Sequence, residues 1–355
     1  MEIVRPAIGS IGGYVPGEQP QTTGWIKLNT NENPYPASPM VAEAVAAACH
    51  RLEIYPDPSA TSFREAAAEV YGLDPDWIMP ANGSDENLTI LMRTFVDPHE
   101  TITYPYPGYI LYETLAAIQG CKVDPMLYDG SWNLDRRAFA KAHEAKLALV
   151  PNPNSPSGTL IDETVFGDLA PDRGLLVLDG AYADFAEGQE PQNVLKDDFE
   201  RRVVVTRTLS KSYSLAGLRF GFAIAHPDLI QSMLKVKDSY NCDSLAIAAA
   251  TAAMKDQAWM LSNRERIVAT RSRAEQALSD LGFAVTPSQA NFLWIRHVAI
   301  PHQEIYQQLK ARKILIRYMK FPLVSWGDSE FDGLRVSIGT DDQIDALLMA
   351  LKEIL

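Results

Sequence analysis

Three side chains near the middle of the sequence have the types and spacing to bind an aldehyde that carries an anionic group. Lys211 follows the valine run of "RVVVTRTLSK", with Ser210 directly before it and Arg219 eight positions after it. A lysine that is partly desolvated and near other cations has a lowered pKa, so its amine is nucleophilic and can form a Schiff base. Ser210 and Arg219 would be donors for the anion. Taken singly, Lys211 would be a surface residue and Arg219 a salt-bridge partner.

A carboxylate and a turn of small residues could complete such a site. Asp179 ends the apolar run "GLLVLD", where a buried carboxylate is costly unless a charged partner is near. Its simpler role would be a helix or turn cap. Gly83, Ser84 and Asp85 precede an apolar helix, whose first amides would form an anion site. An ordinary N-cap with acidic residues in the first turn is the alternative.

Two further stretches follow expected strands. Tyr106 in "TYPYPGYILY" could lie flat on an aromatic ring, although an aromatic turn of the core has the same composition. The turn "VPNPNSPSG" follows "LALV" and supplies polar amides. Together these features match pyridoxal 5′-phosphate (PLP), which needs phosphate donors, a stacking ring, a carboxylate for its pyridine nitrogen and an amine for its aldehyde. The protonated pyridine nitrogen makes this cofactor an electron sink.

The expected elements would place these residues along one edge of a sheet. From about residue 78, short apolar runs alternate with helical stretches, which predicts a parallel sheet covered on both faces. Ligands bind beyond the carboxyl ends of such strands. The first 35 residues are typical of an extended arm, and Ser38 with Pro39, then Ser62 with Glu65, are expected to begin two helices.

Length and composition exclude several classes of protein. A chain of 355 residues with 46% hydrophobic residues predicts an α/β protein of two lobes. We expect a large domain over 31–240 and a smaller α+β domain from 241–355 with the arm, 1–30. A net charge of −13 argues against a nucleic-acid partner. Three scattered cysteines and unclustered histidines indicate neither disulfides nor a metal site, and no stretch approaches the ~20 apolar residues of a membrane span. A cytoplasmic setting is expected.

The combination of motifs resembles the fold-type I PLP-dependent aminotransferases over nearly the whole chain. The stretches that carry the resemblance are "YVPGEQP", "IKLNTNENPYPASP", "YPDPS", "NGSDE", "PNPNSPSG", "LDGAYADF", "TLSKSYSLAGLRFG", "ILIRY" and "LRVSIGT". It implies a mostly parallel seven-stranded sheet in the large domain, a smaller α+β domain, and a homodimer with shared active sites. The motifs look most like the branch of the family that serves histidine biosynthesis by transferring an amino group from histidinol phosphate to 2-oxoglutarate.

Other functions use the same machinery. Transamination of an aromatic amino acid is one alternative, and a PLP lyase such as a threonine-phosphate decarboxylase is another. A non-enzymatic PLP-binding domain is a third, which the intact pair of Lys211 and Asp179 disfavours.

The resemblance assigns a role to each residue that contacts the cofactor. Lys211 would form the covalent aldimine with PLP and move the proton at the substrate α-carbon. Asp179 would pair with the pyridine nitrogen, and Tyr182 would donate to the phenolic oxygen. The residues that would hold the phosphate are Gly83, Ser84, Asp85, Ser210 and Arg219, with Tyr55 reaching the phosphate of the other subunit.

The resemblance also places the substrate and leaves two contacts open. Arg335 would bind the anionic end of the substrate with help from Arg317, and the arm that covers the substrate would include Tyr14 and Asn33. Many members of the family have asparagine immediately before the last proline of the "PNPNSPSG" turn, where this chain has Ser155, with Asn154 before it. Either could therefore meet the phenolic oxygen. For the stacking ring we expect Tyr106 first and Tyr109 second.

Overall fold

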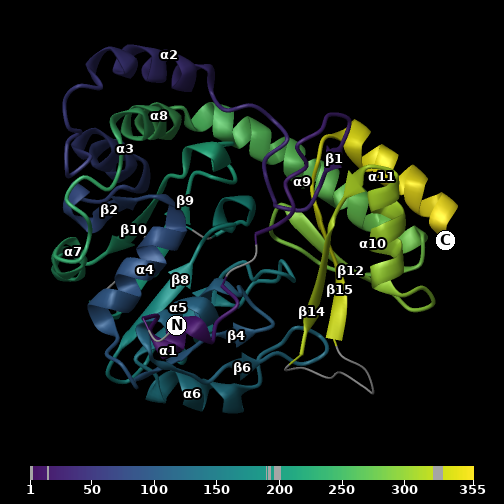
Figure 1. Ribbon diagram of the computed structural model, residues 1–355, viewed down its shortest axis with the longest axis horizontal. Coiled ribbons are helices and arrows are strands. Elements are labelled where there is room, and N and C mark those ends of the chain that lie inside the picture. The colour runs from purple at the N-terminus through teal and green to yellow at the C-terminus, as the bar shows by residue number, and fades with distance from the viewer. Residues whose placement is uncertain (1–2, 14–15, 189, 191–192, 196–200, 323–330) are drawn as a thin grey trace.

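A seven-stranded sheet forms the centre of the computed structural model, which describes residues 3–13, 16–188, 190, 193–195, 201–322 and 331–355 (Figure 1). In spatial order its strands are β2 (Ile78–Ala81), β10 (Gly221–Ala225), β9 (Val203–Thr208), β8 (Leu175–Asp179), β7 (Leu147–Pro151), β3 (Thr101–Thr103) and β5 (Lys122–Val123). β10 runs antiparallel to both of its neighbours, and the other pairs are parallel. The predicted mostly parallel seven-stranded sheet is confirmed.

Helices cover both faces of this sheet because successive side chains of a strand point to opposite faces. Leu176 and Leu178 of β8 pack in the core that includes α3 (Thr61–Tyr71), α6 (Phe139–Glu144) and α8 (Ser244–Lys255). Val177, between them, packs in the core with α4 (Gly83–Phe95), α5 (Leu111–Gln119) and α7 (Pro227–Leu234). This two-sided burial explains why the strands are continuous apolar runs.

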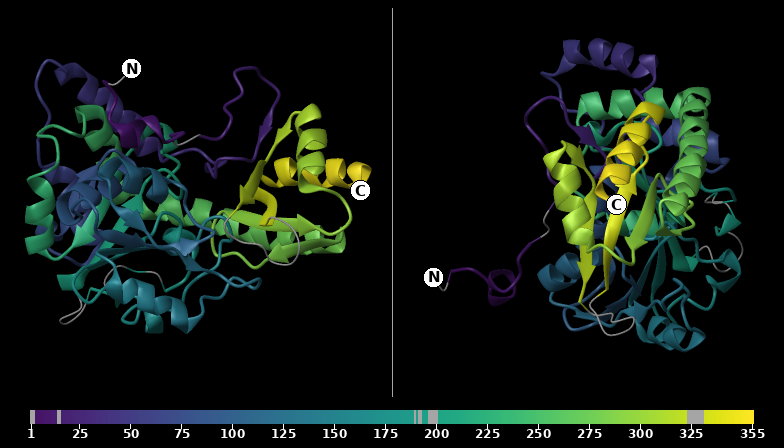
Figure 2. Two further views of the ribbon diagram at one scale, coloured as in Figure 1. Left: turned by 60° about the horizontal axis from the view of Figure 1, so that its bottom comes forward. Right: turned by 90° about the vertical axis from the view of Figure 1, so that its right-hand side faces the viewer.

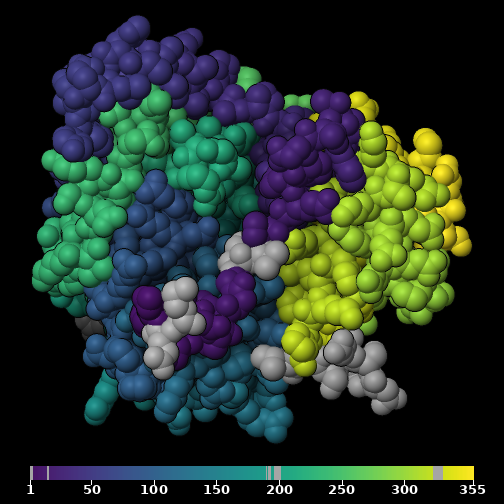
Figure 3. Space-filling model, viewed as in Figure 1, coloured from purple at the N-terminus to yellow at the C-terminus, as the bar shows by residue number. Residues whose placement is uncertain are grey.

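The smaller lobe is a four-stranded antiparallel sheet with helices against it. Its strand order is β11 (Phe283–Thr286), β12 (Phe292–His297), β15 (Phe331–Ser337) and β14 (Arg317–Phe321), with α10 (His302–Ala311) and α11 (Asp341–Ile354) alongside. The arm joins this lobe, since β1 (Ile26–Lys27) pairs in parallel with β13 (Ile314–Leu315). Figure 2 shows the two lobes side by side, with the C-terminus on the smaller one, and in Figure 3 the part of the arm from residue 16 onward lies between them.

Four further helices and strands belong to the described chain. The helices are α1 (Pro6–Gly9) and α2 (Pro39–Ala48), of which α2 packs on α8, and the strands β4 (Pro105–Tyr106) and β6 (Met126–Leu127) pair in parallel. Among the described residues, no helix combines the length and apolar character needed to cross a membrane.

The long helix α9 (Gln257–Asp280) connects the two cores. Met260 packs in the core of the large sheet, whereas Ile267 and Leu278 pack in the core of the smaller lobe. Because α8 also belongs to the large core, we propose that the domain boundary lies within α9, after the predicted position near residue 240.

Several chain segments meet at one edge of the large sheet. Asp179 ends β8 and is paired with Thr206 of the neighbouring strand β9. β9 ends at Thr208, three residues before Lys211. Gly221, at the start of the antiparallel strand β10, pairs with both Thr208 and Ala81, the last residue of β2. The strand directions therefore bring the predicted site residues to a common edge.

Candidate active site

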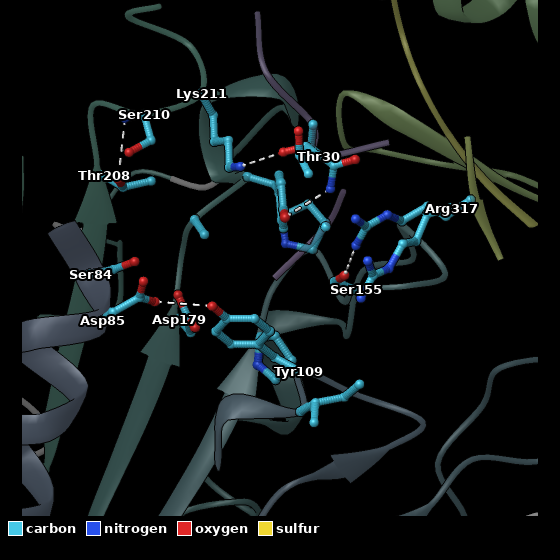
Figure 4. Close-up of a pocket in the computed structure, with 18 of the residues that line it drawn as sticks. Thr30, Ser84, Asp85, Tyr109, Ser155, Asp179, Thr208, Ser210, Lys211 and Arg317 are labelled. Atoms are coloured by element: carbon cyan, nitrogen blue, oxygen red, sulfur yellow. Dashed lines mark hydrogen bonds between the residues drawn. The ribbon is translucent and has the colours of Figure 1, made fainter. Parts of the chain in front are cut away.

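A cavity of about 170 Å³ opens at this edge of the sheet. The predicted site residues that line it are Ser84, Asp85, Tyr109, Ser155, Asp179, Tyr182, Ser210, Lys211, Arg219, Arg317 and Arg335. Figure 4 shows Ser84 and Asp85 on one side of the cavity and Arg317 on the other, with Lys211 pointing between them. The fold thus assembles residues from both lobes around one space.

Lys211 is half-buried in the loop that follows β9. Its Nζ donates to the carbonyl oxygen of Thr30 at 3.2 Å and lies 5.6 Å from the centre of the Tyr182 ring. The side-chain amide of Asn33 donates to the carbonyl oxygens of Lys211 and Ser212, each at 3.1 Å. Asn33 does not line the cavity, so we propose that it positions the lysine loop, in place of the predicted contact with substrate.

Asp179 is a buried carboxylate, only 4% exposed, that faces the cavity. Burial raises the pKa of Asp179, while hydrogen bonds from Tyr112 (2.8 Å) and Thr206 (3.1 Å) oppose that shift. A carboxylate in this setting is best stabilised by a cation or by a proton shared with a ring nitrogen. Asp179 therefore fits the role of partner to a pyridinium.

The part of the cavity wall formed by Ser84, Asp85, Ser210 and Arg219 offers hydrogen-bond donors for a phosphate. Gly83 begins α4 with a φ of 75°, a left-handed conformation that favours glycine, and a Cβ atom there would lie 2.8 Å from Nη2 of Arg219. The Nη1 of Arg219 donates to Ser210 Oγ at 3.3 Å. The first amides of the 13-residue helix α4 have no partner within the helix. This donor set fits the phosphate of PLP.

The Asp85 side chain links the phosphate wall to an aromatic ring. Its carboxylate pairs with Arg219 at 3.2 Å and accepts from the Tyr109 hydroxyl at 3.1 Å. Tyr109 lines the cavity, whereas Tyr106 belongs to β4, which pairs with β6, and packs edge-on against Phe321 with ring centres 5.9 Å apart. Sequence analysis placed Tyr106 first and Tyr109 second, and from this geometry we propose Tyr109 as the stacking ring.

Two arginines of the smaller lobe face the cavity from neighbouring strands. Arg317 of β14 and Arg335 of β15 are directly paired in the antiparallel register. Arg335 donates to Ser155 Oγ at 3.0 Å and to the carbonyl oxygen of Asn29 at 3.1 Å. Two adjacent guanidinium groups form a strong site for an anionic substrate group.

The turn before Pro156 settles which of its two polar residues reaches the cavity. Ser155 lines it, whereas Asn154 is fully buried and donates to the carbonyl oxygen of Pro107 at 3.3 Å and to Ser157 Oγ at 2.8 Å. We therefore propose Ser155, and not Asn154, for the contact with a phenolic oxygen.

A further predicted residue, Tyr55, does not line the cavity. Tyr55 is 78% exposed and stacks on Tyr240, with ring centres 4.6 Å apart. Tyr14 lies outside the described residues. Within the described part of the chain, no cluster of three His, Cys, Asp or Glu side chains is arranged to hold a metal ion.

Sequence reasoning missed three residues that form hydrogen bonds to side chains of the site. Asn31 donates to the Tyr182 hydroxyl at 2.9 Å, and Tyr112 and Thr206 donate to Asp179. The sequence could have indicated Thr206, because it is a polar residue within a strand of valines. It gave no indication of Tyr112 beyond its place three residues after Tyr109, the spacing of neighbours on one helix face.

Comparison with known proteins agrees with this geometry. Residues 23–351 match the family model for class I and II aminotransferases. The histidinol-phosphate aminotransferase of Rhodopirellula baltica is 50% identical over 351 residues, covering 98% of this chain and 94% of the relative. That of a Synechocystis species is 43% identical over 352 residues, covering 99% and 98%. The crystal structure of histidinol-phosphate aminotransferase from Sinorhizobium meliloti in complex with pyridoxal-5′-phosphate superposes with a TM-score of 0.87 at 26% identity, covering 100% and 98%.

Proposed function

This chain belongs to the class I and II aminotransferases, and from that premise we propose that it transfers the amino group of histidinol phosphate to 2-oxoglutarate with PLP as cofactor. The observation that carries the proposal is the arrangement of one cavity. Lys211 and Asp179 lie in it between the donors around Arg219 and the paired arginines Arg317 and Arg335. One end suits the cofactor phosphate and the other suits the anion of a substrate.

The cavity residues have separable roles in the transfer. Bound PLP supplies an aldehyde for an amine and a ring that accepts electrons. Lys211 Nζ would remove the proton at the substrate α-carbon as a general base and then deliver it to the C4′ carbon of the cofactor as a general acid. Asp179 holds the proton on the ring nitrogen. Tyr182, oriented by Asn31, donates to the phenolic oxygen.

The paired arginines explain how one site accepts two substrates in turn. Histidinol phosphate has no carboxylate, so its phosphate would bind Arg335 and Arg317. Glutamate and 2-oxoglutarate would place a carboxylate at the same position. A guanidinium group matches the geometry of either anion, so no rearrangement of the site is required.

Replacing Arg335 with alanine is expected to lower kcat/KM about 100-fold for both substrates, mainly through KM, because two hydrogen bonds to a charged group are lost. Steady-state kinetics with histidinol phosphate and with 2-oxoglutarate measure the effect. The matched control is Arg312→Ala, since Arg312 lies at the end of α10 and pairs with Glu353. An unchanged KM for both substrates would exclude Arg335 from anion binding.

Rapid mixing of the holoenzyme with candidate amines tests the proposed substrate directly. The panel comprises histidinol phosphate, phenylalanine, tyrosine, glutamate and threonine phosphate, and loss of the visible cofactor absorption ranks them. Histidinol phosphate and glutamate are expected to react fastest. A faster reaction with phenylalanine or tyrosine would favour the aromatic alternative. Release of CO2 from threonine phosphate without consumption of an amino acceptor would identify a lyase.

We also propose that the enzyme is a cytoplasmic homodimer in which Tyr55 reaches the partner's cofactor phosphate. The large exposed apolar side chains around Tyr55 support an interface there, namely Leu52, Ile54 and Tyr240. Light scattering coupled to gel filtration gives the molecular mass, and a monomer that retains full activity would contradict the shared site.

A further inference from the structure

Asp179 receives two buried hydrogen bonds from residues that have no place in the mechanism described above. The Tyr112 hydroxyl of α5 donates to its Oδ2 at 2.8 Å, and the Thr206 hydroxyl of β9 donates to its Oδ1 at 3.1 Å. Both side chains belong to residues that are 0% exposed. Each oxygen of the carboxylate is therefore held by its own donor, from a different element.

The surroundings of Asp179 otherwise disfavour its charge. The residue is 4% exposed, so its ionised form loses most of its hydration. The carboxylate of Asp85 lines the same cavity and also raises the pKa of Asp179. Hydrogen bonds from Tyr112, Thr206 and the backbone of Ala181 act in the opposite direction. The ionised carboxylate thus depends on a small set of neutral donors.

We infer that Tyr112 and Thr206 are positioning residues that keep Asp179 ionised, so that the proton it shares with the cofactor stays on the ring nitrogen. The inference rests on the proposed function, because it assumes that PLP occupies the cavity. A carboxylate stripped of its donors binds a proton more tightly. Without them the shared proton moves toward Asp179, and the ring becomes a weaker electron acceptor.

A phenol is well suited to this role at the position of Tyr112. Burial and the neighbouring carboxylate raise the pKa of Tyr112 far above its usual value, so its hydroxyl remains a neutral donor. Its ring packs edge-on against Tyr109, with centres 5.6 Å apart, and at a tilt against Tyr104, with centres 5.4 Å apart. Phenylalanine would preserve both ring contacts and remove only the donor.

The test measures the protonation of the ring nitrogen in the holoenzyme. Tyr112→Phe, Thr206→Val and the double variant are loaded with PLP labelled with ¹⁵N at the ring, and the ¹⁵N chemical shift reports whether that nitrogen carries a proton. Each single variant is expected to shift the resonance toward the neutral value, and the double variant to shift it further. The kcat is expected to fall about tenfold for each donor lost, with the KM for the amino donor little changed.

The matched control is Tyr104→Phe. Tyr104 is a buried neighbour of Tyr112 whose hydroxyl donates to Glu113 at 2.8 Å instead of to Asp179. Its variant is expected to keep the wild-type ¹⁵N shift, and an equal shift there would overturn the inference. Thr206→Val lies on a strand and keeps the test decisive if Tyr112→Phe folds poorly.

The outcomes separate this inference from the proposed function. A wild-type ¹⁵N shift in the double variant overturns the roles of Tyr112 and Thr206 but leaves the proposed transamination intact. A wild-type protein that binds no PLP, or that holds it with an unprotonated ring nitrogen, overturns both.

Discussion

Replacing Lys211 with alanine is expected to lower kcat by more than about 10⁴-fold and to abolish the visible absorption of covalently bound PLP. Lys211 is the one lysine among the described residues that line the cavity, so no other amine there can take its place. Its Nζ lies 3.2 Å from the Thr30 carbonyl oxygen and above the Tyr182 ring, contacts that direct it into the site. The substitution removes both the covalent attachment and the group that moves the substrate proton.

Two companion variants show whether the loss is specific to this amine. Lys211→Arg keeps the positive charge but has no nucleophilic amine at neutral pH, so it is expected to be as inactive as Lys211→Ala. Lys352→Ala changes an exposed lysine on α11 and is expected to have normal kinetics. Absorption spectra and single-turnover kinetics measure all three proteins. Turnover by Lys211→Ala with its visible absorption intact would remove Lys211 from the mechanism.

The residues at strand ends could be predicted from the sequence because strand direction alone decides where they lie. Asp179 and Lys211 each follow an apolar run, and parallel strands bring such positions to one edge of the sheet. Local capping was predictable at Ser38 for the same kind of reason, since its side chain accepts from Met40 N and Pro39 takes the first helical position.

Features that depend on a competing neighbour could not be predicted in this way. The helix expected to begin at Ser62 begins at Thr61 instead, because the carboxylate of Asp57 accepts from the backbone amides of Ser59 and Thr61. Ser62 Oγ lies near Thr251 Oγ1 of α8, at 3.3 Å. Asp57 and Ser62 are both residue types that cap helices, and the sequence does not show which of them contacts the first backbone amides.

The sequence could not show which tyrosine of this segment lies at the cavity, for the same reason. Tyr106, Tyr109 and Tyr112 occur within seven residues, and their types do not distinguish the core from the cavity. The pairing of β4 with β6 holds Tyr106 in the core, and the start of α5 directs Tyr112 to Asp179. These are long-range contacts, so a pattern read along the chain cannot contain them.

Replacing Asp179 with asparagine is expected to lower kcat on the order of 10³-fold, because the preorganised charge that supports the electron-poor ring is lost. The amide has nearly the same shape as the carboxylate, and its oxygen can still accept from Tyr112 or Thr206. It cannot carry the negative charge that holds a proton on the ring nitrogen. The variant is expected to fold, because burial raises the pKa of the Asp179 carboxyl, so its charge does not stabilise the folded state. It is also expected to bind PLP with the ring nitrogen neutral.

The loss of activity in Asp179→Asn is the largest loss that the variants of Tyr112 and Thr206 can cause if they act only through Asp179. Asp172→Asn, at an exposed position where the carboxylate pairs with His143, is the matched control and is expected to behave as wild type. If Tyr112 and Thr206 act through Asp179, removing either donor from Asp179→Asn costs little further activity, because the charge they stabilised is already absent. Single-turnover rates and ¹⁵N shifts of the combined variants measure this. Fully additive losses would show that the two donors act on the reaction by another route, and near-normal turnover by Asp179→Asn would exclude the carboxylate from catalysis.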